Sequence, residues 1–114
     1  MQDFHKLDVW KKAHHLTLNV FKAADQQAMR DSFLSAQLRR TGVIISTRIT
    51  EGCTKENNVE FARCLQLSRA SCYELEYLIL LARDLEYLVS EAHDGLFNQL
   101  VEVRKMLSGL LRTL

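Results

Sequence analysis

The chain has 114 residues, of which 47% are hydrophobic and 25% charged, with a formal net charge of +1, four glycines and no proline. This composition excludes a disordered chain, and the scarcity of turn residues excludes a protein of many strands. We therefore expect a single all-α domain over residues 1–114.

The charges are unevenly divided along the sequence. Residues 1–55 contain nine Lys/Arg and five Asp/Glu, whereas residues 56–114 contain six and nine. A basic half and an acidic half suit either head-to-tail self-association or a basic face that binds a partner. Chance asymmetry between solvated faces is the alternative interpretation.

The three cysteines, Cys53, Cys64 and Cys72, are odd in number and lack the Cys-x-x-Cys spacing of zinc sites. We expect free thiols buried as small apolar groups, in keeping with a reducing cytosol. Residues 1–10 are mixed and charged, unlike a signal peptide, and the longest apolar run, 78–82, is too short to cross a bilayer. These features predict a cytoplasmic protein with no membrane contact.

The first predicted helix runs from about Asp8 to Asp25. Asp8 suits its start, because the N-terminal end of a helix favours negative charge. The apolar residues recur at intervals of three and four, as on the buried face of an amphipathic helix. A polar break, 25–30, follows. The apolar positions are Val9, Ala13, Leu16, Val20 and Ala24, with Trp10 and Phe21 beside them.

The second predicted helix runs from about Ser32 to Gly52, with Asp31 as its expected N-cap and Gly52 as its terminator. Gly42, inside it, costs roughly 1 kcal/mol relative to alanine, which close approach of a neighbouring helix would offset. Residues 43–45 alone would also suit a buried strand, but no partner strand is predicted. The apolar stripe is Leu34, Leu38, Thr41, Ile45 and Ile49.

The third predicted helix begins after Asn57, with Glu60 in the spacing of a capping box, and continues to about Leu85. It has two stripes at helical spacing, which predicts two burial surfaces. One stripe is Phe61, Cys64, Ser68, Cys72, Leu75, Ile79 and Ala82. The other is Leu67, Ala70, Ser71, Leu78, Leu81 and Leu85.

The fourth predicted helix begins after Ser90, with Glu91 and Asp94 in its first turn. Its leucines and valine alternate by four and three, the spacing of a bundle seam. Four helices joined by short loops pack as an antiparallel, up-down four-helix bundle. The surplus apolar positions predict a subunit interface, or else fill a wide core. The seam is Leu96, Leu100, Val103, Leu107, Leu110 and Leu114.

No catalytic or metal site is predicted. A di-iron bundle needs Glu-x-x-His motifs, which this chain lacks, and the adjacent His14 and His15 cannot converge on one metal from a helix. No base is placed near a cysteine, and no phosphate-binding glycine loop is present. We expect no catalytic residue, no metal, no cofactor and no enzymatic activity.

Charged residues on the second and third helices carry the remaining predictions. Glu74 falls on the second stripe of its helix and needs a partner, for which Arg40 or Arg39 is the candidate; a structural ion pair is expected, and a catalytic acid is the lesser alternative. Arg39, Arg40, Arg48 and Lys55 lie along one helix and its exit, where they would contact phosphates. A solvated face with local ion pairs is the alternative.

Five segments resemble a known family: 4–13 (Phe-x-x-Leu-x-Val-Trp-x-x-Ala), 37–40 (Gln-Leu-Arg-Arg), 49–52 (Ile-Thr-Glu-Gly), 61–65 (Phe-Ala-Arg-Cys-Leu) and 70–76 (Ala-Ser-x-x-Glu-Leu-Glu). In this order they look like the bacterial four-helix bundle proteins encoded in intervening sequences of 23S ribosomal RNA genes. The accessory variability protein of diversity-generating retroelements is similar.

The resemblance implies an up-down bundle that forms a homopentameric, barrel-like ring and binds nucleic acid through basic surface residues. In the retroelement branch it implies a reverse transcriptase as partner, and in neither branch an enzymatic activity. Two positions depart from the family pattern. Ser46 replaces its proline and Arg48 replaces its asparagine, so that a kink is not expected and a charge is added.

Three functions from different classes follow. The first is a homo-oligomeric adaptor that associates with nucleic acid. The second is a pure protein-interaction module, in which the apolar surplus docks a partner such as a reverse transcriptase. The third is an enzyme or metal protein whose site has no sequence signature.

Overall fold

The computed structural model describes all 114 residues, and it is all-helical, as predicted. Four long helices are accompanied by two short ones, and no strand is present. In chain order they are η1 (Phe4–Lys6, a 3-10 helix), α1 (Asp8–Ala24), α2 (Gln27–Arg30), α3 (Leu34–Gly52), α4 (Asn58–Asp84) and α5 (Ser90–Arg112).

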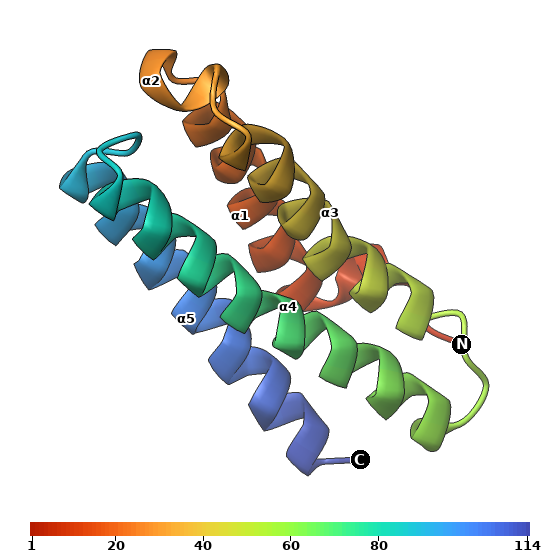
Figure 1. The fold of residues 1–114 in the computed structure, drawn as a ribbon. Helices are drawn as coiled ribbons and strands as arrows, with labels where there is room; N and C mark the ends of the chain where they lie inside the picture. Colours follow the sequence, from red (N-terminus) through yellow and green to blue (C-terminus); the bar gives the residue numbers. More distant parts are fainter.

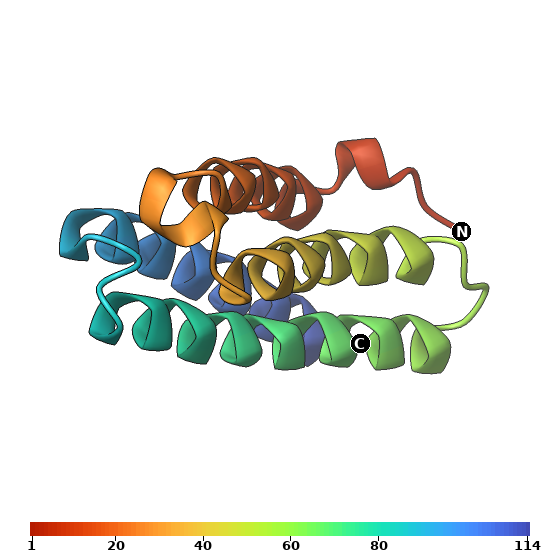
Figure 2. The same cartoon turned by 45° about the horizontal axis from the view of Figure 1, so that its top comes forward.

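The long helices pack around a common axis in chain order. α1 packs on α3, α3 on α4 and α4 on α5, and α5 closes the arrangement against α1. The molecule measures 44 × 20 × 19 Å. Both termini lie at the end where α3 connects to α4, and α2 lies at the opposite end with the α4–α5 connection (Figure 1). Figure 2 shows the same elongated shape from a second direction.

The predicted polar break after the first helix contains α2, a single turn that sequence periodicity did not reveal. Met29 is fully buried there and anchors the turn to the core. The expected N-cap at Asp31 is wrong, because Asp31 ends α2, and α3 begins at Leu34 without a side-chain cap. The cap at Asn57 is confirmed, since its side chain accepts a hydrogen bond from the Glu60 backbone N–H at 2.9 Å.

Two glycines allow α3 to approach its neighbours closely. A β-carbon on Gly42 would lie 3.3 Å from Val20 Cγ1 of α1, which confirms the expected close approach. A β-carbon on Gly52 would lie 3.0 Å from both Cys64 and Phe61 of α4. α3 ends at Gly52, as predicted, but the glycine has no positive φ and so does not end the helix through a left-handed conformation. Its role is to let α4 pack closely.

Hydroxyl groups form hydrogen bonds between the helices within their packed faces. Thr17 Oγ1 donates to the Gly42 carbonyl at 2.9 Å and lies 2.7 Å from Ser46 Oγ, across the α1–α3 contact. The buried Ser68 hydroxyl donates to the Ile45 carbonyl at 2.7 Å, between α4 and α3. α3 is continuous through Ser46, the position where the family pattern has proline.

Candidate nucleic-acid interface

Two of the four basic residues predicted to contact phosphates are held in local contacts. Arg39 donates to the Ser35 hydroxyl at 2.7 Å and lies 4.0 Å from the Asp25 carboxylate. Arg48 donates to Glu51 at 3.0 Å, and this hydrogen bond lowers the pKa of the Glu51 carboxyl below its usual value. These two arginines therefore follow the alternative interpretation, a solvated face with local ion pairs in place of phosphate contacts.

Arg40 and Lys55 take part in no ion pair of the structure. Arg39 and Arg48 are nine residues apart, which on a helix places them on opposite edges of α3. Arg39 turns to the α1 side, where Asp25 ends that helix, and Arg48 turns to the α4 side, where Glu51 meets Cys64. The four residues thus do not form one face.

The predicted ion pair between Glu74 and Arg40 is wrong. Glu74 is exposed, and neither Arg39 nor Arg40 reaches it. Its position on the second stripe of α4 does not require burial, because that stripe lies at the edge of the helix contact and not within it. The interhelical ion pair of α4 is instead made by Glu76, whose carboxylate lies 2.6 Å from Arg104 of α5.

The fold sorts the charges along its long axis. With each long helix divided at its midpoint, the half that carries both termini comprises residues 1–16, 43–71 and 101–114 and has ten Lys/Arg and six Asp/Glu. This half is the basic end. The acidic end, residues 17–42 and 72–100, has five Lys/Arg and eight Asp/Glu. Arg48 and Lys55 belong to the basic end, whereas Arg39 and Arg40 belong to the acidic end.

The second stripe of α4 is only partly buried. Leu67 and Leu85 are 44% and 45% exposed, Leu78 and Leu81 are half-buried, and Ser71 is buried. The stripe follows Cys64 at intervals of three and four, and the Cys64 thiol donates to Glu51 of α3 at 3.6 Å. These leucines therefore form an apolar strip along the α3 side of α4, which leaves apolar surface uncovered in the single chain.

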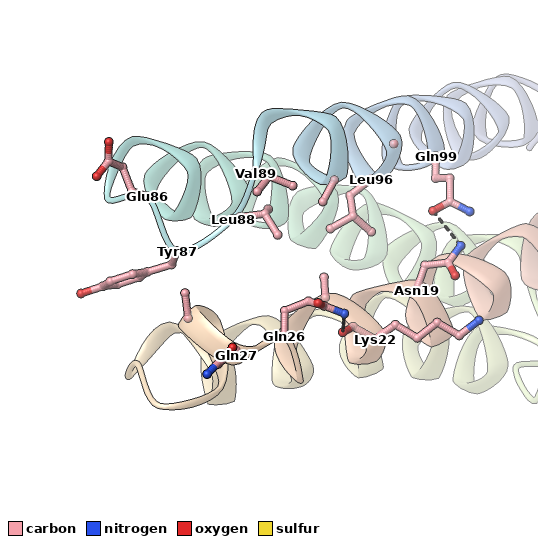
Figure 3. A pocket seen from close by; sticks show the side chains of 14 residues that line it. Asn19, Lys22, Gln26, Gln27, Glu86, Tyr87, Leu88, Val89, Leu96 and Gln99 are labelled. Carbon is pink, nitrogen blue, oxygen red and sulfur yellow. Dashed lines mark hydrogen bonds between the residues drawn. The ribbon is translucent and has the colours of Figure 1, made fainter.

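A hollow of about 620 Å³ opens at the acidic end, between the end of α1, α2 and the α4–α5 connection (Figure 3). Asn19 Nδ2 donates to Gln99 Oε1 at 3.1 Å across it. Its charged residues, Lys22 and Glu86, take part in no ion pair. The sequence held no signal for this hollow, because it depends on how far α5 stands from α1. Apolar walls are supplied by Ala23, Leu88, Val89, Ala92 and Leu96.

The three thiols are buried and unpaired, as expected from the cysteine count. Burial raises the pKa of the Cys72 thiol to about 12 and also raises those of Cys53 and Cys64. No three His, Cys, Asp or Glu side chains come together in a way that could hold a metal ion. None of the helices combines the length and apolar character that crossing a bilayer requires.

Comparison with known proteins places the chain in a family. The family model of the 23S rRNA-intervening sequence protein matches residues 5–109. The crystal structure of a protein of unknown function from the S23 ribosomal protein family of Bacteroides thetaiotaomicron has the same fold, with a TM-score of 0.83 and 22% identity over 90% of this chain and 97% of that one. No curated protein is significantly similar. Because the family model covers nearly the whole chain, this protein belongs to the 23S rRNA-intervening sequence protein family.

Proposed function

We propose that this chain is a non-enzymatic, cytoplasmic, homo-oligomeric protein that associates with nucleic acid. In this proposal its helices form an up-down antiparallel bundle, and its basic end meets the phosphates. The observation that carries the proposal is the excess of four positive charges at that end, against an excess of three negative charges at the other. The family name, which refers to ribosomal RNA, supports the same reading.

Phosphate binding by a small cluster of cations has a measurable signature. Each neutralised phosphate releases counterions, so affinity falls with added salt by a slope of about 0.7–0.9 per phosphate on logarithmic axes. We expect the purified protein to bind RNA or DNA at low salt and to release it steeply between about 50 and 200 mM salt. Absence of binding to both at low salt would refute the proposal.

A matched pair of substitutions tests whether nucleic acid contacts the basic end or the outward face of α3. Lys55→Gln and Arg40→Gln each remove one positive charge that makes no ion pair, but they lie at opposite ends. We expect Lys55→Gln to weaken binding a few-fold and Arg40→Gln to leave it unchanged. The reverse result would place the contact on α3, and equal losses would support the set of four basic residues that the sequence predicted.

Homo-oligomerisation, with a pentameric ring as the specific expectation, is proposed from the apolar strip of Leu67, Leu78, Leu81 and Leu85. Exposed contiguous apolar surface is uncommon on monomers and marks interaction sites. Sedimentation of the wild type should give a mass of several chains. Leu67→Ser with Leu85→Ser should reduce it, whereas Val59→Ser, which is exposed on α4 away from this strip, should not. A monomeric wild type at micromolar concentration would contradict the assembly.

The same strip also favours a second candidate function, a pure protein-interaction module that docks a partner such as a reverse transcriptase. That function predicts binding of a purified reverse transcriptase, loss of this binding in the Leu67→Ser, Leu85→Ser variant, and no salt-sensitive binding of nucleic acid. It is excluded if the variant still binds the enzyme with wild-type affinity.

A further inference from the structure

We infer that the outward edge where α4 meets α5, at Arg69, Tyr73, Tyr77 and Lys105, is a stacking surface for the bases of single-stranded nucleic acid. This surface is called the tyrosine face below. The inference rests on the proposed association with nucleic acid and names the class of nucleic acid and a surface that adjoins the basic end: Arg69 and Lys105 belong to that end, and the two tyrosines follow directly beyond its boundary on α4.

Two tyrosines one helical turn apart are displayed to solvent on this edge. Tyr73 is 58% exposed and Tyr77 is 60% exposed, so that both rings project from a rigid helix. Residues four apart lie on the same side of a helix. Proteins that bind single strands place successive bases on such aromatic side chains, because every base has a face that can stack. In a duplex those faces are already occupied by neighbouring base pairs.

The ring of Tyr73 is held in place from one side. The Arg104 guanidinium lies over it, with its central carbon 4.3 Å from the ring centroid. Arg104 is itself fixed by Glu76 at 2.6 Å. A ring that is already ordered loses little freedom when a base stacks on it, which favours binding. Arg104 covers one face of the ring, and the exposure of Tyr73 leaves surface for a base.

Three cations without carboxylate partners lie on the same two helices as the rings and their Arg104 contact. Arg69 is one turn before Tyr73 and donates to the Ser108 hydroxyl of α5 at 3.2 Å. Lys105 and Arg112 lie one turn before and one turn after Ser108 on α5. None of these three cations belongs to an ion pair. Phosphates that follow a strand across the rings would therefore meet positive charge that is not already neutralised.

The charge pattern favours nucleic acid over a protein partner on this face. The apolar strip on the α3 side of α4 has leucines and an unpaired acidic residue, Glu74, whereas on the α5 side the carboxylate of Glu76 is neutralised by Arg104, and the unpaired Arg69 lies one turn before Tyr73. Proteins that bind single strands combine aromatic rings with free cations, whereas contacts between helical subunits are rich in leucine. The two edges of α4 thus differ in the partner that they fit.

The test compares a labelled 12-nucleotide oligothymidylate with a 12-base-pair duplex by fluorescence anisotropy at low salt. The single strand should bind more tightly than the duplex. Tyr73→Ala and Tyr77→Ala should each weaken its binding by about tenfold, and Tyr73→Phe and Tyr77→Phe should stay near the wild type because the rings remain. Phe33→Ala removes an exposed aromatic ring at the start of α3, outside the tyrosine face; it is the matched control and should bind as the wild type does.

Thermal melts separate loss of binding from loss of folding. Tyr77 takes part in no ring stack or hydrogen bond, so Tyr77→Ala should keep the fold even if Tyr73→Ala, which loses the Arg104 contact, is less stable. If the wild type binds the single strand and both alanine variants bind it equally well, the tyrosine face is refuted and the proposed function stands. If no probe binds at low salt, both fail. If the alanine variants lose sedimenting mass at unchanged affinity, the face is a contact between protein chains.

Discussion

Gly52 has no room for a β-carbon, whereas Gly95 has open space around it. A methyl group on Gly52 would lie 3.0 Å from side-chain atoms of Phe61 and Cys64, and one on Gly95 would meet nothing within 4 Å. Gly52→Ala should destabilise the bundle by about 1–3 kcal/mol through overpacking, and Gly95→Ala should stabilise it by about 0.5–1 kcal/mol through helix propensity. Denaturant titration measures both. Equal effects would show that propensity alone governs these sites.

Cys72 links stability to pH. Its folded-state pKa is raised from 9.0 to about 12 by burial, so the folded protein keeps the thiol neutral while the unfolded chain ionises it. This stabilisation is fully present below pH 9 and is lost as the pH rises toward 12, by roughly 1.4 kcal/mol for each pH unit. The free-energy difference between wild type and Cys72→Ala should therefore shrink over this range. A constant difference would mean that the thiol does not titrate with unfolding.

At the scale of the element, the second residue after the end of α4 has an uncommon backbone conformation. Glu86 has φ of 63°, in the left-handed region that normally favours glycine at the end of a helix. The Tyr87 N–H donates to the Ala82 carbonyl at 2.8 Å, which closes the last turn. Asp84 is the last helical residue, close to the predicted end at Leu85.

Replacing Glu86 by glycine should relieve the strain of its left-handed backbone conformation. Glu86→Gly should raise the free energy of unfolding by roughly 0.5–1 kcal/mol, because a non-glycine residue pays a steric cost in that region. Glu91→Gly, in the first turn of α5, should lower it by about 1 kcal/mol. Thermal unfolding of the two variants compares them directly. A destabilised Glu86→Gly would mean that the flexibility gained by the unfolded chain outweighs the strain.

At the scale of the whole molecule, the position of a charge should matter more than the total. Arg112→Gln and Arg30→Gln reduce the net charge equally, and neither arginine belongs to an ion pair, but Arg112 lies at the basic end and Arg30 at the acidic end. We expect Arg112→Gln alone to weaken nucleic-acid binding a few-fold and to lower its salt slope by roughly 0.7–0.9. Equal losses would show that binding follows the net charge of +1 and not its distribution.

Two local predictions were confirmed, at Asn57 and Gly42, whereas the local prediction of a cap at Asp31 failed because α2 occupies that stretch. The capping hydrogen bond of Asn57 spans three residues, and the close approach at Gly42 follows from the absence of a side chain in a buried helix face. The ion pair of Glu74 with Arg40 failed because it required a distance between two helices. The sequence did not indicate the tyrosine face, because the contact that holds the Tyr73 ring comes from Arg104 on another helix.

The sequence by itself determined the helical class and three of the four long helices to within two residues, because helix periodicity is a local property of 3.6 residues per turn. Packing decided which neighbours Arg39 and Arg48 meet and that α2 forms around Met29. It also decided that the charges separate along the bundle axis, and not only between the first and second halves of the sequence. Successive side chains of a helix point in different directions and therefore contact different neighbours. Which partner each one meets depends on how four helices bury their apolar stripes together.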